Sequence, residues 1–180
     1  MPEDDGIEAN VLADADMNAN AAAPSRGQRS ATRLAAVQAL YQIDVADASP
    51  EEVLQGFKGE SWSKADPDLE LPAPDEQLLE DLVMGVFGQQ PSVDAALDAA
   101  LDVGHSIERL EVLLRAVLRA GAYELKPLSS VPSKVVINEY VDLAHAFFAG
   151  KEPALVNAVL DRLAHSLGPA DKTQDKTDGR

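Results

Sequence analysis

Three arginines lie close together at the start of the first amphipathic segment of this chain. Arg26, Arg29 and Arg33 fall within eight consecutive positions that hold no acidic residue, although the 180-residue chain has a formal net charge of −16. Arginine presents a planar fork of donors that fits phosphate oxygens and guanine edges. Cations near a helix N-terminus oppose the helix dipole, which disfavours the alternative of a merely solvated helix start. The cluster therefore predicts a contact with phosphate.

The acidic composition of the chain limits how a nucleic acid would be held. The chain contains 15 Lys and Arg residues against 31 Asp and Glu residues. A protein that binds nucleic acid through bulk counterion release is basic overall. We therefore expect binding through the local basic patch, with weak affinity for the protein alone.

A second group of arginines lies on a strongly apolar segment, where Arg115 and Arg119 are four residues apart. Buried arginines are normally paired with carboxylates. We interpret this pair as structural, and the acidic residues considered as partners are Glu111, Glu124 and Glu139.

The sequence gives no support for catalysis or for a bound metal or cofactor. There is no cysteine, and no glycine-rich phosphate loop or Ser/His/Asp arrangement is present. Asn138, Asp142 and His145 share one helical face, but one amide, one carboxylate and one imidazole make a poor metal site. We interpret them as the polar face of a helix.

The elements that carry these residues are predicted to be helices. Apolar residues make up 46% of the chain and aromatic residues only 4%, and no sustained two-residue alternation is present. The patterns predict an all-α fold of about seven helices. The expected helical segments are 29–46, a capped helix from Ser49 to about 57, 75–101 with a restart at Pro91, 106–125 as two helices or one bent helix, 133–149, and a last helix that has Pro153 as its first residue.

The domain organisation follows from the same patterns. Residues 26–168 are expected to form one helical domain, with a long polar loop at 58–74. Residues 1–25, which are acidic, and residues 169–180 are expected to be disordered tails. No secretory signal and no membrane-spanning run is seen, so we expect a cytoplasmic protein that does not contact a membrane.

Four segments together resemble the NusB family of transcription antitermination factors. Residues 29–42 (RSATRLAAVQALYQ) resemble the opening helix of that family, and residues 118–125 (LRAGAYEL) resemble its central helix. Residues 131–144 and 155–161 are similar to its last two helices. The order and spacing of these segments agree across residues 26–168.

The resemblance implies two packed helical bundles and an adaptor without enzymatic activity. Such an adaptor binds boxA-type RNA together with the ribosomal protein NusE, joins the RNA polymerase elongation complex, and promotes transcription of ribosomal RNA. The RNA-binding positions that it implies are Arg26, Arg29, Arg33, Lys134 and Asn157. The positions that it implies for the protein partner are Tyr41, Glu108 and Glu111.

The sequence also departs from the family pattern and leaves alternatives open. Leu114 replaces a common acidic residue, while Leu155 and Ala158 replace a Phe and a Gly in the last motif. One alternative is a helical module that binds protein but no RNA. Another is a relative of the NusB-like domain of ribosomal RNA cytosine methyltransferases, which the absence of cysteine disfavours. A homodimer remains compatible with the sequence.

Overall fold

The computed structural model describes residues 24–58, 71–125 and 131–168, and the regular structure in these ranges is entirely helical. This confirms the predicted all-α fold. Most of the predicted N-terminal tail, the predicted tail at 169–180 and most of the 58–74 loop lie outside the described residues. The elements are α1 (Arg26–Ala46), α2 (Pro50–Gln55), α4 (Glu76–Gly88), α5 (Gln90–Ala100), the 3-10 helix η1 (Ile107–Arg109), α6 (Val112–Glu124), α7 (Ser133–Phe147) and α8 (Glu152–Leu167).

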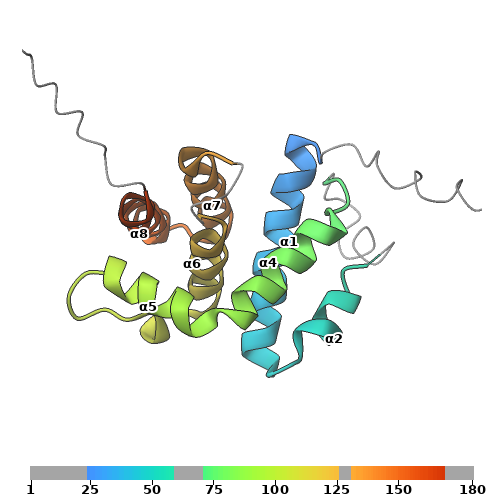
Figure 1. Cartoon of the computed structure of the whole chain (residues 1–180), viewed down its shortest axis with the longest axis horizontal. Helices are drawn as coiled ribbons and strands as arrows, with labels where there is room; N and C mark the ends of the chain where they lie inside the picture. The colour runs from blue at the N-terminus through green and yellow to red at the C-terminus, as the bar shows by residue number, and fades with distance from the viewer. Residues whose placement is uncertain (1–23, 59–70, 126–130, 169–180) are drawn as a thin grey trace, which may run out of the picture.

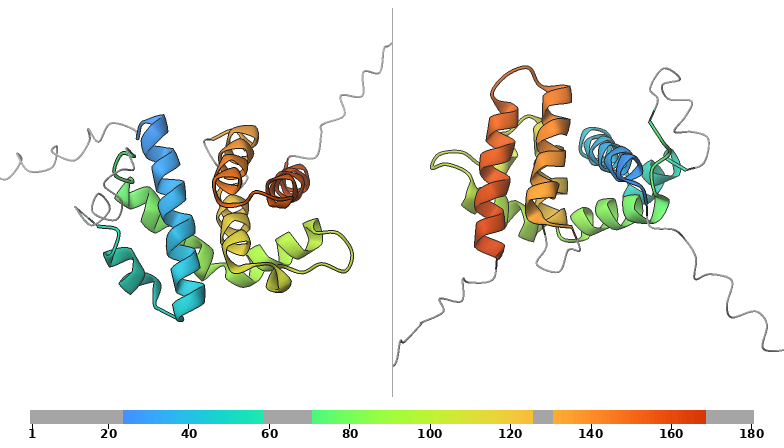
Figure 2. Two further views of the ribbon diagram at one scale, coloured as in Figure 1. Left: turned by 180° about the vertical axis from the view of Figure 1, so that it is seen from behind. Right: turned by 90° about the horizontal axis from the view of Figure 1, so that it is seen from above.

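Helix α6 joins two groups of helices (Figure 1). It packs against α1 and α4 on one side and against α5, α7 and α8 on the other. Helix α2 completes the first group by packing on α1 and α4, and α7 pairs with α8 in the second. The views in Figure 2 show the same division from behind and from above. The arrangement matches the predicted pair of packed bundles.

Two glycines allow neighbouring helices to approach α6 closely. A Cβ atom on Gly121 of α6 would lie 2.8 Å from a methyl carbon of Leu160 on α8. A Cβ atom on Gly85 of α4 would overlap the ring of Tyr123 on α6. Larger side chains at these positions would therefore push α8 and α4 away from the central helix.

Capping side chains fix where the helices of the first bundle begin. The backbone N–H of Gln28 donates to Ser25 Oγ at 3.2 Å, so α1 begins at Arg26, three residues before the predicted start. Ser49 and Glu52 form the capping box that the sequence predicts. Asp75 caps α4 by accepting from the backbone N–H of Leu78 at 2.7 Å.

Two further segments can be compared in detail with the prediction. Of the two alternatives predicted for residues 106–125, the structure has the two helices, η1 and α6. Helix α8 begins at Glu152, which places Pro153 at the second helical position and not the first. Within the described ranges, none of the helices is sufficiently long and apolar to cross a bilayer.

Candidate nucleic-acid interface

Two of the three clustered arginines lie at the surface of the first turns of α1. Because α1 begins at Arg26, both Arg26 and Arg29 belong to the helix, whereas the sequence placed Arg26 just before it. The Arg26 side chain is 90% exposed, and its Nε lies 3.9 Å from a carboxylate oxygen of Glu139. Arg29 is half-buried and has no ion pair with a carboxylate of the described residues. Both guanidinium groups are therefore available to an anion.

The third arginine, Arg33, is directed into the protein. Its side chain is only 4% exposed. It donates through Nε and Nη2 to the two carboxylate oxygens of Glu124 on α6, and through Nη1 to Glu139 on α7 at 3.2 Å. Burial opposes its charge, but the hydrogen bond and charge of Glu124 outweigh this effect and raise the pKa of Arg33 above its usual value. The prediction of direct RNA contact does not fit this position, because a phosphate would have to displace two carboxylates.

Tyr140 and Ser30 complete the hydrogen-bond network around Arg33. The hydroxyl of Tyr140 donates to Glu124 Oε2 at 3.0 Å, and the hydroxyl of Ser30 donates to Glu139 Oε2 at 2.6 Å. Burial raises the pKa of Tyr140 well above its usual value of 10, and the charge of Glu124 adds to this shift. The network fixes the N-terminal half of α1 against α6 and α7, so Arg26 and Arg29 lie on a helix end that is held in place.

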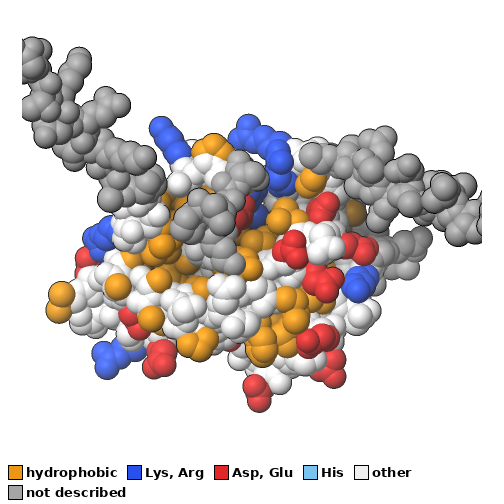
Figure 3. Space-filling view, in the orientation of Figure 1, with side chains coloured by type: hydrophobic (Ala, Val, Ile, Leu, Met, Phe, Trp, Pro, Cys, Tyr) orange, Lys and Arg blue, Asp and Glu red, His pale blue; other side chains and the backbone are white. Residues whose placement is uncertain are grey.

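Helix α7 adds a third cation close to this end of α1. Lys134 is exposed in the first turn of α7, and neither α1 nor α7 has an acidic residue in its first turn. Figure 2 (right) shows the two N-terminal ends side by side, and the contacts of Glu139 with Arg26 and Ser30 link them. In Figure 3, Lys and Arg side chains stand along the upper edge of the molecule, where these ends lie. The positive ends of two helix dipoles therefore add to the side-chain charges.

The remaining predicted RNA position is separate from this group. Asn157 is exposed on α8. Helix α7 lies between α8 and α1 in the view from above in Figure 2. The structure therefore groups Arg26, Arg29 and Lys134 but does not bring Asn157 beside them.

The three predicted partner positions gather at the opposite end of α1. Tyr41 is 38% exposed beside a shallow hollow between α1 and α2. Glu108 is exposed in η1, and Glu111 caps α6 by accepting from the backbone N–H of Leu114 at 3.0 Å. Arg115 links Glu108 to the same end of α1, because it donates to the backbone oxygen of Glu108 at 3.3 Å and to Asp44 of α1 at 3.0 Å. Leu114, a departure from the family pattern, is a buried core residue.

The structure corrects the expected partners of the second arginine group. Arg119 forms a bidentate pair with Asp94 on α5, at 2.8 and 2.7 Å, and donates to Asp44 on α1 at 2.8 Å. Burial opposes the charge of Arg119, but the hydrogen bond and charge of Asp94 outweigh this effect and raise the pKa of Arg119. The expected pairing with carboxylates is thus confirmed, but the predicted partners were wrong. Asp44 and Asp94 lie 75 and 25 residues from Arg119 in the chain, and no local pattern connects them.

The structure offers little for metal chemistry in the ranges it describes. No group of three or more His, Cys, Asp or Glu residues there is arranged to hold a metal ion. Asn138, Asp142 and His145 are all exposed on α7, as expected for a polar helix face.

Comparisons with known proteins agree with this architecture. The model of the NusB family matches residues 30–165. A transcription antitermination protein NusB of Bradyrhizobium sp. (strain ORS 278) is 45% identical over 166 residues, covering 91% of this chain and 94% of that protein. Among solved structures, T. maritima NusB is 28% identical with a TM-score of 0.65, covering 78% of this chain and 93% of that one. The antitermination factors NusB and NusE in complex with double-stranded RNA give a similar fold, with a TM-score of 0.64, 24% identity, and coverage of 79% and 99%.

Proposed function

Because this chain belongs to the NusB family of transcription antitermination factors, we propose that it binds boxA-type RNA through the start of α1. We further propose that it does so together with NusE and carries the RNA to the RNA polymerase elongation complex in the cytoplasm, promoting transcription of ribosomal RNA. The role is that of an adaptor, in which affinity comes from joining partners.

The observation that carries this proposal is the charge at one end of the molecule. Arg26, Arg29 and Lys134 surround two helix N-termini without first-turn acids, in a chain of net charge −16. Three cations supply only a few phosphate contacts, which is too few for tight binding of the protein alone. A second protein that contacts the same RNA would supply the rest.

Arg33 and Asn157 take different places in this proposal. Arg33 supports the RNA surface from beneath, because its pairs with Glu124 and Glu139 hold α1 in position. Asn157, on α8, would reach RNA only if the RNA extended past α7.

The proposed partner face lies at the other end of α1, around Tyr41, Glu108 and Glu111. Arg26 and Tyr41 are separated by roughly 22 Å along α1, so both faces can be used at once.

The test is RNA binding across a salt series, with and without purified NusE. We expect weak, salt-sensitive binding of boxA RNA that strengthens when NusE is added. The variant Arg26→Ala/Arg29→Ala should reduce the slope of log affinity against log salt by about 1.4, or about 0.7 for each lost contact to single-stranded RNA. The matched control Arg109→Ala/Lys151→Ala removes two exposed cations elsewhere and should leave the slope unchanged.

Two outcomes would contradict the proposal. Equal slopes for the two double variants would show that the start of α1 is not the RNA surface. Capture of NusE with no RNA binding under any salt condition would support the alternative, a protein-binding helical module. Circular dichroism of each variant establishes that the fold is retained.

A further inference from the structure

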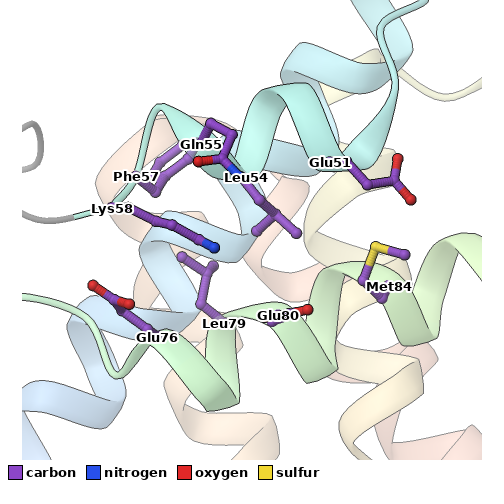
Figure 4. A pocket seen from close by; sticks show the side chains of 9 residues that line it. All are labelled: Glu51, Leu54, Gln55, Phe57, Lys58, Glu76, Leu79, Glu80 and Met84. Atoms are coloured by element: carbon purple, nitrogen blue, oxygen red, sulfur yellow. The ribbon is translucent and has the colours of Figure 1, made fainter.

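A cleft with an apolar floor lies between α2 and α4 (Figure 4). Leu54 of α2 and Leu79 of α4 are buried at its base, and the half-buried Met84 closes one end. Glu51 and Glu80 stand on the rim near Met84, one on each helix. The flexible thioether of Met84 allows this end of the cleft to adapt to different apolar groups.

The rim carries a net negative charge, because Glu51, Glu76 and Glu80 line the cleft against one cation, Lys58. Lys58 and Glu76 lie at the end away from Met84 (Figure 4). Glu51 and Glu80 are exposed and form no ion pair with any residue in the ranges that the structure describes. Asp and Glu side chains gather on the right-hand side of Figure 3, where α2 and the start of α4 lie. A polyanion such as RNA is disfavoured at this surface, and a cationic group is favoured.

We propose that the cleft binds a basic peptide segment of a partner protein. One apolar side chain of the segment enters between Leu54, Leu79 and Met84, and flanking Lys or Arg residues pair with Glu51 and Glu80. Charge complementarity selects this occupant, because the apolar floor favours an aliphatic anchor and the acidic rim favours cations beside it. This surface is separate from the proposed RNA surface at the start of α1, so its test does not depend on the proposed function.

The absence of cysteine from the chain makes a direct test available. Met84→Cys introduces a single thiol into the cleft, and Val103→Cys introduces one at a fully exposed loop position as the control. The probe is a ten-residue peptide that alternates Leu with Lys and Arg, and a second peptide has Glu at the basic positions. We expect a saturating amount of the basic peptide to slow alkylation of the cleft thiol at least tenfold and to leave alkylation of the loop thiol unchanged. The acidic peptide should have no effect on either thiol.

Affinity measurements on the chain with its native Met84 provide a second, independent readout. Glu51→Gln/Glu80→Gln should weaken binding of the labelled basic peptide about five- to tenfold, since two rim ion pairs are lost. Asp142→Asn/Asp161→Asn removes the same charge from exposed positions on α7 and α8 and should change the affinity less than twofold.

Three results would overturn the proposal. Equal weakening by the two double variants would mean that the peptide responds only to overall charge. A cleft thiol in the Met84→Cys variant that is unreactive without peptide would show that another part of this chain occupies the cleft. Protection of that thiol by boxA RNA, and not by the basic peptide, would reassign the surface to nucleic acid.

Discussion

Two arginine pairs with the same four-residue spacing, Arg29 and Arg33 on α1 and Arg115 and Arg119 on α6, occupy different environments. On α6, both members pair with carboxylates from neighbouring helices. On α1, Arg33 pairs with Glu124 and Glu139, while Arg29 has no such pair among the described residues. Helix α6 packs against five helices, α1, α4, α5, α7 and α8, whereas the first turns of α1 lie beside α7 and the segment that precedes α4. An arginine thus becomes structural where a second helix covers it and available to ligands where none does.

The largest effect is expected for Arg119→Ala. This variant leaves Asp94 partly buried without its bidentate partner, and removal of one member of such a pair should cost about 3–4 kcal/mol of unfolding free energy. Urea denaturation followed by circular dichroism measures the loss. A cost below about 1 kcal/mol would mean that the pair behaves as a surface ion pair.

Arg33 and Arg26, at the two ends of the arginine cluster on α1, provide a matched comparison of unfolding free energies. Arg33→Ala should lower the unfolding free energy by about 3 kcal/mol, because Glu124 and Glu139 remain near-buried and lose their main cation. Arg26→Ala should change it by less than about 0.5 kcal/mol, because that side chain is solvated. Similar values from the same denaturation experiment would remove the distinction between a supporting and a ligand-binding arginine.

A smaller effect, and one that depends on pH, is expected for Tyr140→Phe. Loss of the hydrogen bond to Glu124 should cost about 1 kcal/mol near pH 7. The folded-state pKa of Tyr140 is raised, so its stabilising contribution is complete below the unfolded tyrosine pKa of about 10 and is lost as the pH rises from there toward the folded value. The difference in unfolding free energy between the native chain and the variant should therefore shrink above pH 10. A constant difference from pH 8 to pH 11 would contradict this assignment.

The smallest expected effect concerns the acidic residues that precede α1. Residues 1–24 contain six acidic and no basic residues. We expect their charge to compete with RNA for the proposed RNA surface, so deletion should tighten RNA binding about twofold at low salt, and screening should abolish the gain near 1 M salt. Fluorescence anisotropy with labelled boxA RNA measures both conditions. Unchanged affinity at low salt would show that these residues do not compete with RNA.

Much of the fold was available from local patterns in the sequence. The capping box at Ser49 and Glu52 and the apolar stripes on the later helices predicted element types and most boundaries. These signals are local, because capping and amphipathicity depend on residues within one or two turns. The start of α1 was predicted three residues too late, although Ser25 followed by Gln28 at the third helical position matches the sequence signature of a capping box.

The candidate site was only partly predictable, because its decisive contacts join residues that are far apart in the chain. The sequence identified an arginine cluster on one helix, and it placed Arg29 and Arg33 four residues apart. The three-dimensional packing decided that Arg33 faces Glu124 and Glu139, more than 90 residues away, and that Arg119 takes Asp44 and Asp94. Helix periodicity determines the direction of a side chain around its own axis, but the neighbouring helices determine whether that direction leads to solvent or to a buried carboxylate.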